Sequence, residues 1–95
     1  MRIEGAGKPE GCKLIRIQAD IERGLIKTIR IKGDFFAAPE EAFERAESRL
    51  IDIPPDALAD TFDRLIQNSG VEVFGISGAG LASVLFGSMP PEEIP

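Results

Sequence analysis

Residues 75–80, Gly-Ile-Ser-Gly-Ala-Gly, hold the residue types of two known catalytic motifs. A nucleophile elbow needs glycine two residues after its serine, where Ala79 stands, and a histidine elsewhere in the chain. A dinucleotide-binding fingerprint beginning at Gly78 needs glycine or alanine where Ser83 stands, and it opens a βαβ unit with an acidic residue downstream. The stretch fits neither motif. We interpret it as a strand-to-helix turn, with a phosphate-accepting helix N-terminus as the alternative.

The sequence holds no histidine, and Cys12 is its single cysteine. Histidine is the commonest general base and transition-metal ligand, so its absence excludes histidine-containing triads and disfavours self-contained hydrolysis. One cysteine can form no disulfide within the chain and no cysteine metal cluster. Although Lys13 lies beside Cys12, we interpret this thiol, in a glycine-rich segment, as incidental. We therefore predict no catalytic residue and no metal site.

Acidic residues recur through the middle of the chain at helical spacing. They fall opposite apolar stripes, so we interpret them as solvated helix faces rather than as acid–base pairs or magnesium ligands. The residues concerned are Glu40, Glu41, Glu44, Glu47, Asp56, Asp60 and Asp63.

The formal net charge is −5, from 11 basic and 16 acidic residues. This balance disfavours nucleic-acid binding, because affinity for phosphate backbones rests largely on lysine and arginine. A local basic face stays open, because cations gather in the first third of the chain, at Lys8, Lys13, Arg16, Arg23, Lys27, Arg30 and Lys32. No apolar run approaches the roughly 20 residues that span a bilayer, and the N-terminus lacks a signal-like apolar segment. We expect a cytoplasmic protein with no membrane or nucleic-acid partner.

Alternating residues predict an antiparallel hairpin in the first third. Residues 1–12 are rich in glycine and are predicted to form an irregular lead-in. A strand follows, with Ile15, Ile17, Ala19 and Ile21 on its buried face. A connection at residues 22–24 leads to a second strand at 26–32. Ile26 is out of phase with Ile29 and Ile31, which indicates either a bulge near Lys27 or an apolar residue capping the edge.

Two helices and a third strand are predicted next. The first helix begins at Pro39, buries Phe43, Ala46 and Leu50, and stops near Ile51. The second follows the 54–56 break, stops at residues 68–70, and buries Leu58, Phe62, Leu65 and Ile66. Residues 71–76 are predicted to form a strand that joins the hairpin.

A final short helix is predicted to begin at Ser77 and to bury Leu81, Val84 and Leu85. The tail at 88–95 is predicted to be flexible because it is rich in proline. Together these elements predict one α+β domain over residues 1–95, in which a small antiparallel sheet of about three strands packs with two to three helices.

Phe35 and Phe36 leave the second strand together, and adjacent side chains of an extended chain point in opposite directions. In one interpretation they close two sides of the core. In the other, one of them stays exposed as an apolar anchor for a partner, since aromatic side chains dominate interface energetics.

The residues 11–16 (Gly-Cys-Lys-Leu-Ile-Arg), 33–36 (Gly-Asp-Phe-Phe), 39–41 (Pro-Glu-Glu) and 71–73 (Val-Glu-Val) form a series that resembles the C-terminal accessory domain of lipoate–protein ligases. The archaeal two-chain form, in which this domain is a small subunit, fits best. The resemblance covers roughly residues 8–86. One departure is Cys12, where the family commonly has the second glycine of a pair.

The resemblance implies an α+β chain that is not an enzyme alone but is needed for ATP-dependent activation of lipoate to lipoyl-adenylate. The large catalytic subunit is the implied partner, and it would hold lipoate, ATP and Mg²⁺, with no cofactor bound by this chain alone. Lipoyl-acceptor domains would be indirect partners. By motif position and charge, we expect Lys13 to face phosphate, and Asp34, Phe35 and Phe36 to line the subunit contact.

Composition alone is equally compatible with a non-enzymatic interaction module unrelated to lipoate. A third alternative is a fragment of a longer single-chain ligase.

Overall fold

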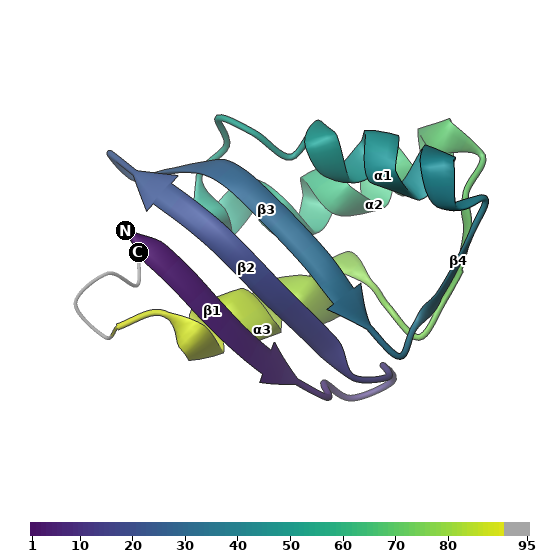
Figure 1. The fold of residues 1–95 in the computed structure, drawn as a ribbon, viewed down its shortest axis with the longest axis horizontal. Helices are drawn as coiled ribbons and strands as arrows, with labels where there is room; N and C mark the ends of the chain where they lie inside the picture. The colour runs from purple at the N-terminus through teal and green to yellow at the C-terminus, as the bar shows by residue number, and fades with distance from the viewer. Residues whose placement is uncertain (91–95) are drawn as a thin grey trace.

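The computed structural model describes residues 1–90, which form an α+β fold with three helices and two antiparallel sheets (Figure 1). The larger sheet has the strand order β1-β2-β3, and the smaller one pairs β4 with β5. In chain order the elements are β1 (Arg2–Gly7), β2 (Ile15–Glu22), β3 (Leu25–Gly33), β4 (Phe36–Ala38), α1 (Glu40–Ser48), the 3₁₀ turn η1 (Pro55–Ala57), α2 (Leu58–Ser69), β5 (Glu72–Phe74) and α3 (Gly78–Ser88). The predicted fold class is confirmed.

The predicted hairpin is the centre of the larger sheet. Strands β2 and β3 pair antiparallel, and a tight turn at Arg23 and Gly24 joins them, both with positive φ. Ile21 lies opposite Ile26, whereas Asp20 lies opposite Thr28, so Lys27 is the extra residue. This confirms the bulge near Lys27, which lets Ile26, Ile29 and Ile31 all turn inward.

The prediction of an irregular lead-in is wrong for Arg2–Gly7, which form β1 beside β2. Glycine content misled the prediction, because glycine is depleted in strands. Gly5 and Gly7 alternate with outward-facing residues and point toward α3. A Cβ at Gly5 would lie 1.7 Å from Ser88 Oγ, so close approach of the helix requires a residue without a side chain.

The late strand forms, but the prediction that it joins the hairpin is wrong. β5 pairs with β4 in a separate two-stranded ribbon, with Phe36 opposite Phe74 and Ala37 opposite Val73. The edge position beside β2 is already taken by β1, and α1 lies along the outer edge of β3 (Figure 1). There Glu47 accepts a hydrogen bond of 2.7 Å from the Ile31 amide. Neither edge of the β2–β3 hairpin is therefore open to β5.

Helices α1 and α2 begin where proline predicts. α1 ends at Ser48, three residues before the predicted Ile51, although Leu50 is fully buried as expected. The chain turns at Asp52, whose φ is 57°, to bring Ile53 beside Ile26 of β3. That turn ends the helix early. α2 stops where predicted, with Gly70 in the left-handed conformation.

Helix α3 begins as predicted, because the Ser77 side chain accepts a hydrogen bond of 3.0 Å from the Gly80 amide. The predicted flexible tail began at Ser88, but Ser88 is the last residue of α3 and Met89 is buried. Residues 91–95 of that tail lie outside the described residues. Within the described chain, no helix combines the length and apolar character that crossing a bilayer requires.

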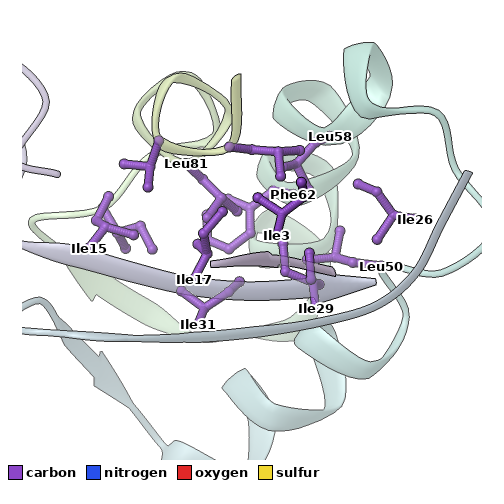
Figure 2. Packing of buried hydrophobic residues seen from close by; sticks show 14 of the residues in the cluster. Ile3, Ile15, Ile17, Ile26, Ile29, Ile31, Leu50, Leu58, Phe62 and Leu81 are labelled. Atoms are coloured by element: carbon purple, nitrogen blue, oxygen red, sulfur yellow. The ribbon is translucent and has the colours of Figure 1, made fainter. Parts of the chain in front are cut away.

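The core lies between the larger sheet and helices α2 and α3. Figure 2 shows Ile17 of β2, Phe62 of α2 and Leu81 of α3 converging in this space. All three are buried. No helix of the described residues covers the opposite face of the sheet, which the alternate residues of each strand form (Figure 1). The fold thus leaves one sheet face and the β4–β5 ribbon accessible.

Candidate functional site

The residues singled out by the sequence come together at one end of the molecule, where β3 ends and the β4–β5 ribbon begins. The Asp34 amide donates to the Leu14 carbonyl at 2.9 Å, and the Lys13 amide donates to the Gly75 carbonyl at 2.8 Å. Residues 13–14 therefore lie between the end of β3 and the end of β5. Lys13, Asp34, Phe35 and Phe36 are neighbours in space, as a shared site requires.

Lys13 packs through its stem and leaves its ammonium exposed. Gly75 has a φ of 85°, and a Cβ there would lie 2.5 Å from Lys13 Cγ, so only glycine fits beside this lysine. Among the described residues, Lys13 forms no salt bridge. The stem of Lys13 thus lies against Gly75, while its ammonium has no ionic partner within residues 1–90.

Each interpretation holds for one of the two phenylalanines: Phe35 packs against the core and Phe36 stays exposed. Phe35 is half-buried, and its ring centroid lies 5.5 Å from that of Phe43 in α1. Phe43 in turn meets Phe62 of α2 at 6.3 Å in an edge-to-face arrangement. Phe36 points the other way and is 57% exposed. Phe35 therefore closes the core, and Phe36 remains available to a partner.

Phe74 is the residue that sequence reasoning missed. It lies opposite Phe36 in the ribbon register and is 67% exposed, the most exposed large apolar side chain among the described residues. The two rings share the outer face of the ribbon, which we call the aromatic patch. The signal was present in the sequence: in an alternating strand Phe74 shares a face with Glu72 and not with the half-buried Val73.

The strand-to-helix turn interpretation of residues 75–80 is confirmed. The Gly78 amide donates to Asp63 Oδ1 at 2.8 Å, and the Gly80 amide donates to Ser77 Oγ. A Cβ at Gly78 would lie 2.1 Å from the Ala59 carbonyl oxygen, so this glycine allows α2 and α3 to approach. Two amides at the N-terminus of α3 therefore already bind oxygens of this chain.

Cys12 and two of the acidic residues have structural positions that sequence reasoning did not assign. Cys12 is buried, with its Sγ 3.7 Å from Ser77 Oγ, so this residue packs in the core and does not lie in an irregular exposed segment. Glu47 and Asp63 are hydrogen-bonded to backbone amides, as described above, rather than purely solvated. Across residues 1–90, no group of three or more histidine, cysteine or acidic residues is arranged to hold a metal ion.

Fold and site together define a small α+β chain with an exposed aromatic patch and, beside it, a lysine that forms no salt bridge among the described residues. No protein-family model matches the sequence. Subunit 2 of lipoate–protein ligase A from Thermoplasma acidophilum is 36% identical to it over 63 residues, 62% of this chain and 67% of the relative. The chain belongs to the family of this small ligase subunit.

A solved structure agrees with this assignment. It comes from a study of an archaeal lipoylation system of T. acidophilum, described as a bipartite lipoate protein ligase and its E2 lipoyl domain. The matching chain superposes with a TM-score of 0.70 and 28% identity, over 90% of this chain and 97% of that one. Family membership decides in favour of a ligase subunit over the unrelated interaction module that composition left open.

Proposed function

We propose that this chain binds the catalytic chain of a two-chain lipoate–protein ligase and is required there for ATP-dependent activation of lipoate to lipoyl-adenylate. The aromatic patch carries the proposal, because exposed aromatic side chains are the commonest anchors of protein interfaces. The bipartite ligase of T. acidophilum supports the two-chain arrangement.

In this proposal Phe36 and Phe74 enter an apolar depression on the catalytic chain. Asp34 lies at the edge of the contact, where its exposed carboxylate can accept hydrogen bonds from the partner. Phe35 contributes indirectly, because its packing on Phe43 fixes the start of β4 and hence the direction of Phe36.

Lys13 is proposed to face phosphate groups held by the catalytic chain. Its stem is fixed against Gly75 next to the aromatic patch, so docking of the patch would bring the ammonium to the subunit boundary. A lysine placed there supplies positive charge where the activation step handles phosphate.

Across the described residues, no group of three or more acidic side chains could hold a metal ion, and the Gly78 and Gly80 amides at the N-terminus of α3 donate to Asp63 and Ser77. We therefore assign ATP, Mg²⁺ and lipoate to the catalytic chain, with lipoyl-acceptor domains as indirect partners. The contribution of this chain is to order the facing loops and to exclude water during activation, then to move aside for the acceptor.

The test is pyrophosphate release from ATP in the presence of lipoate, measured for the catalytic chain with and without this chain. We expect release only when both chains are present. Equal release by the catalytic chain alone, or two chains that do not co-elute on size exclusion, would overturn the proposal.

Lys13→Ala tests the lysine separately. We expect an unchanged dissociation constant for the complex and roughly tenfold slower pyrophosphate release, equivalent to about 1.4 kcal/mol of the barrier. Lys8→Ala is the matched control, because Lys8 is exposed and also forms no salt bridge among the described residues. If Lys13→Ala leaves both binding and release intact, the phosphate-facing role is abandoned.

A further inference from the structure

The uncovered face of the larger sheet carries three exposed cations at the end nearest the aromatic patch. Arg16 of β2 and Lys32 of β3 are register partners, and Arg30 is the next residue on this face of β3. Their chain neighbours Ile15, Ile17, Ile29 and Ile31 all turn into the core. Strand alternation thus fixes all three cations on one surface. We call Arg16, Arg30 and Lys32 the basic face.

Among residues 1–90, no carboxylate forms a salt bridge with the basic face. The cross-strand partners of Arg16 are Ala6 on one side and Lys32 on the other. In the next row Glu4 is already engaged, accepting a hydrogen bond of 2.6 Å from Gln18. Lys32 also lines a pocket of about 190 Å³ with Glu44 and Glu47 of α1. Within residues 1–90, however, none of the three cations lies within 4.0 Å of a carboxylate oxygen.

Like charges placed directly opposite each other destabilise a sheet. The Arg16–Lys32 pair therefore weakens the free chain, and it stands on a protein whose formal net charge is −5. A cluster of cations on a molecule of opposite net charge is the arrangement that charge complementarity with a partner surface uses.

We propose that the basic face steers association with a carboxylate-rich surface of the catalytic ligase chain. This inference rests on the proposed function and adds the chemistry of the partner surface. Arg16 and Lys32 lie at the end of the hairpin where Leu14 accepts a hydrogen bond from Asp34 and Lys13 donates one to Gly75, so the basic face lies at the end of the sheet from which the β4–β5 ribbon extends. Complementary charges at the margin of an interface raise the association rate, whereas buried aromatic anchors slow dissociation.

A protein carboxylate surface fits the basic face better than a nucleic acid does. A phosphate backbone extends well beyond three cations and would meet the acidic remainder of this chain, which repels it. A second copy of this chain could offer the acidic residues of α1. The test below distinguishes the catalytic chain from both of these alternative partners.

The test measures association and dissociation rate constants of the two chains from about 0.01 M to about 1 M salt, over which the Debye length falls from about 30 Å to about 3 Å. We expect the association rate constant to fall steeply with salt. Arg16→Glu should lower it about tenfold at the lowest salt, with the dissociation rate constant changed less than about twofold. Arg23→Glu is the matched control: it makes the same charge change at the opposite end of the hairpin, and it should have a much smaller effect.

A second variant separates steering from a general loss of fold. Arg16→Thr removes the like-charge pair with a residue suited to strands, so it should unfold at the same or a higher temperature while still slowing association.

Equal slowing by Arg16→Glu and Arg23→Glu, or an association rate that ignores salt, would overturn steering while leaving the complex and the proposed function intact. No binding at any salt would overturn both proposals. A salt-sensitive dimer of this chain that Arg16→Glu abolishes would assign the face to a second copy. RNA binding lost in the same variant would assign it to nucleic acid. Either result overturns the inference.

Discussion

The Phe36 and Phe74 rings lie opposite each other with more than half of each side chain in solvent. If they anchor the catalytic chain, Phe36→Thr and Phe74→Thr should each raise the dissociation constant of the complex at least about tenfold, or about 1.4 kcal/mol. Threonine keeps the strand preference, so the fold should persist. Isothermal titration calorimetry measures the effect.

Ile51→Thr is the control for the aromatic variants. Ile51 is 48% exposed and lies near the start of β3, away from the patch. An equal loss of binding in this variant, or full binding by the two phenylalanine variants, would contradict an interface at the ribbon.

Two features require glycine at position 75, a left-handed backbone conformation and the close approach of the Lys13 stem, and substitution can separate them. Gly24 and Gly75 have φ values of 77° and 85°, but only Gly75 faces a close neighbour. Gly24→Ala should cost about 1–2 kcal/mol of the free energy of unfolding, from the left-handed backbone alone. Gly75→Ala should cost at least about 1 kcal/mol more because its Cβ would overlap the Lys13 stem. Urea unfolding of both variants tests this, and equal losses would show that the contact is easily relaxed.

At the scale of elements, alternation and helical spacing predicted a strand or helix correctly wherever the pattern of apolar and polar side chains matches the pattern of burial. The β2–β3 hairpin and α2 follow such patterns, and the out-of-phase Ile26 even indicated the bulge. β1 was missed because Gly5 and Gly7 have no side chain to show alternation, and the residues that require glycine there are Ser88 and Val84 of α3, 83 and 77 residues further along the chain. The partner of β5 was also beyond sequence patterns, because pairing depends on which sheet edges the rest of the fold leaves free.

The same limits explain the site. Lys13, Asp34 and Phe36 were found from motif order and charge, and the structure brings them together. Phe74 was missed although alternation with Glu72 placed it on the outer face of its strand, because its position beside Phe36 follows only from the pairing of β5 with β4. The positions of Cys12, Glu47 and Asp63 depend on contacts between distant elements, which no local pattern encodes.

Helix α1 protects the outer edge of β3 through one hydrogen bond. Glu47→Ala leaves the Ile31 amide without its acceptor, and we expect a loss of about 1 kcal/mol in the free energy of unfolding. Glu44→Ala is the control, because Glu44 lies on the same helix and its exposed carboxylate accepts no hydrogen bond from residues 1–90. Thermal unfolding compares the two. Equal stability would show that water replaces the carboxylate at no cost.

At the scale of the whole molecule, stability depends on how closely α3 packs against both the sheet and α2. Gly78→Ala places a Cβ 2.1 Å from a backbone oxygen of α2, which cannot move without shifting the helix. We expect a loss of about 1–3 kcal/mol. Gly87→Ala in the same helix meets no atom within 4 Å and should be neutral or stabilising by up to about 1 kcal/mol. Chemical denaturation measures both, and similar values would contradict tight packing at Gly78.

The ribbon that carries the aromatic patch is also the least self-sufficient part of the fold. β4 and β5 have three residues each, and they join only after the chain has passed through α1, η1 and α2. Two-stranded ribbons of this size are marginal in water. Its amides should therefore exchange hydrogen through local unfolding long before those of β2 and β3 do. A partner bound to Phe36 and Phe74 would prevent this local unfolding, so binding and the local folding of the ribbon would be thermodynamically coupled.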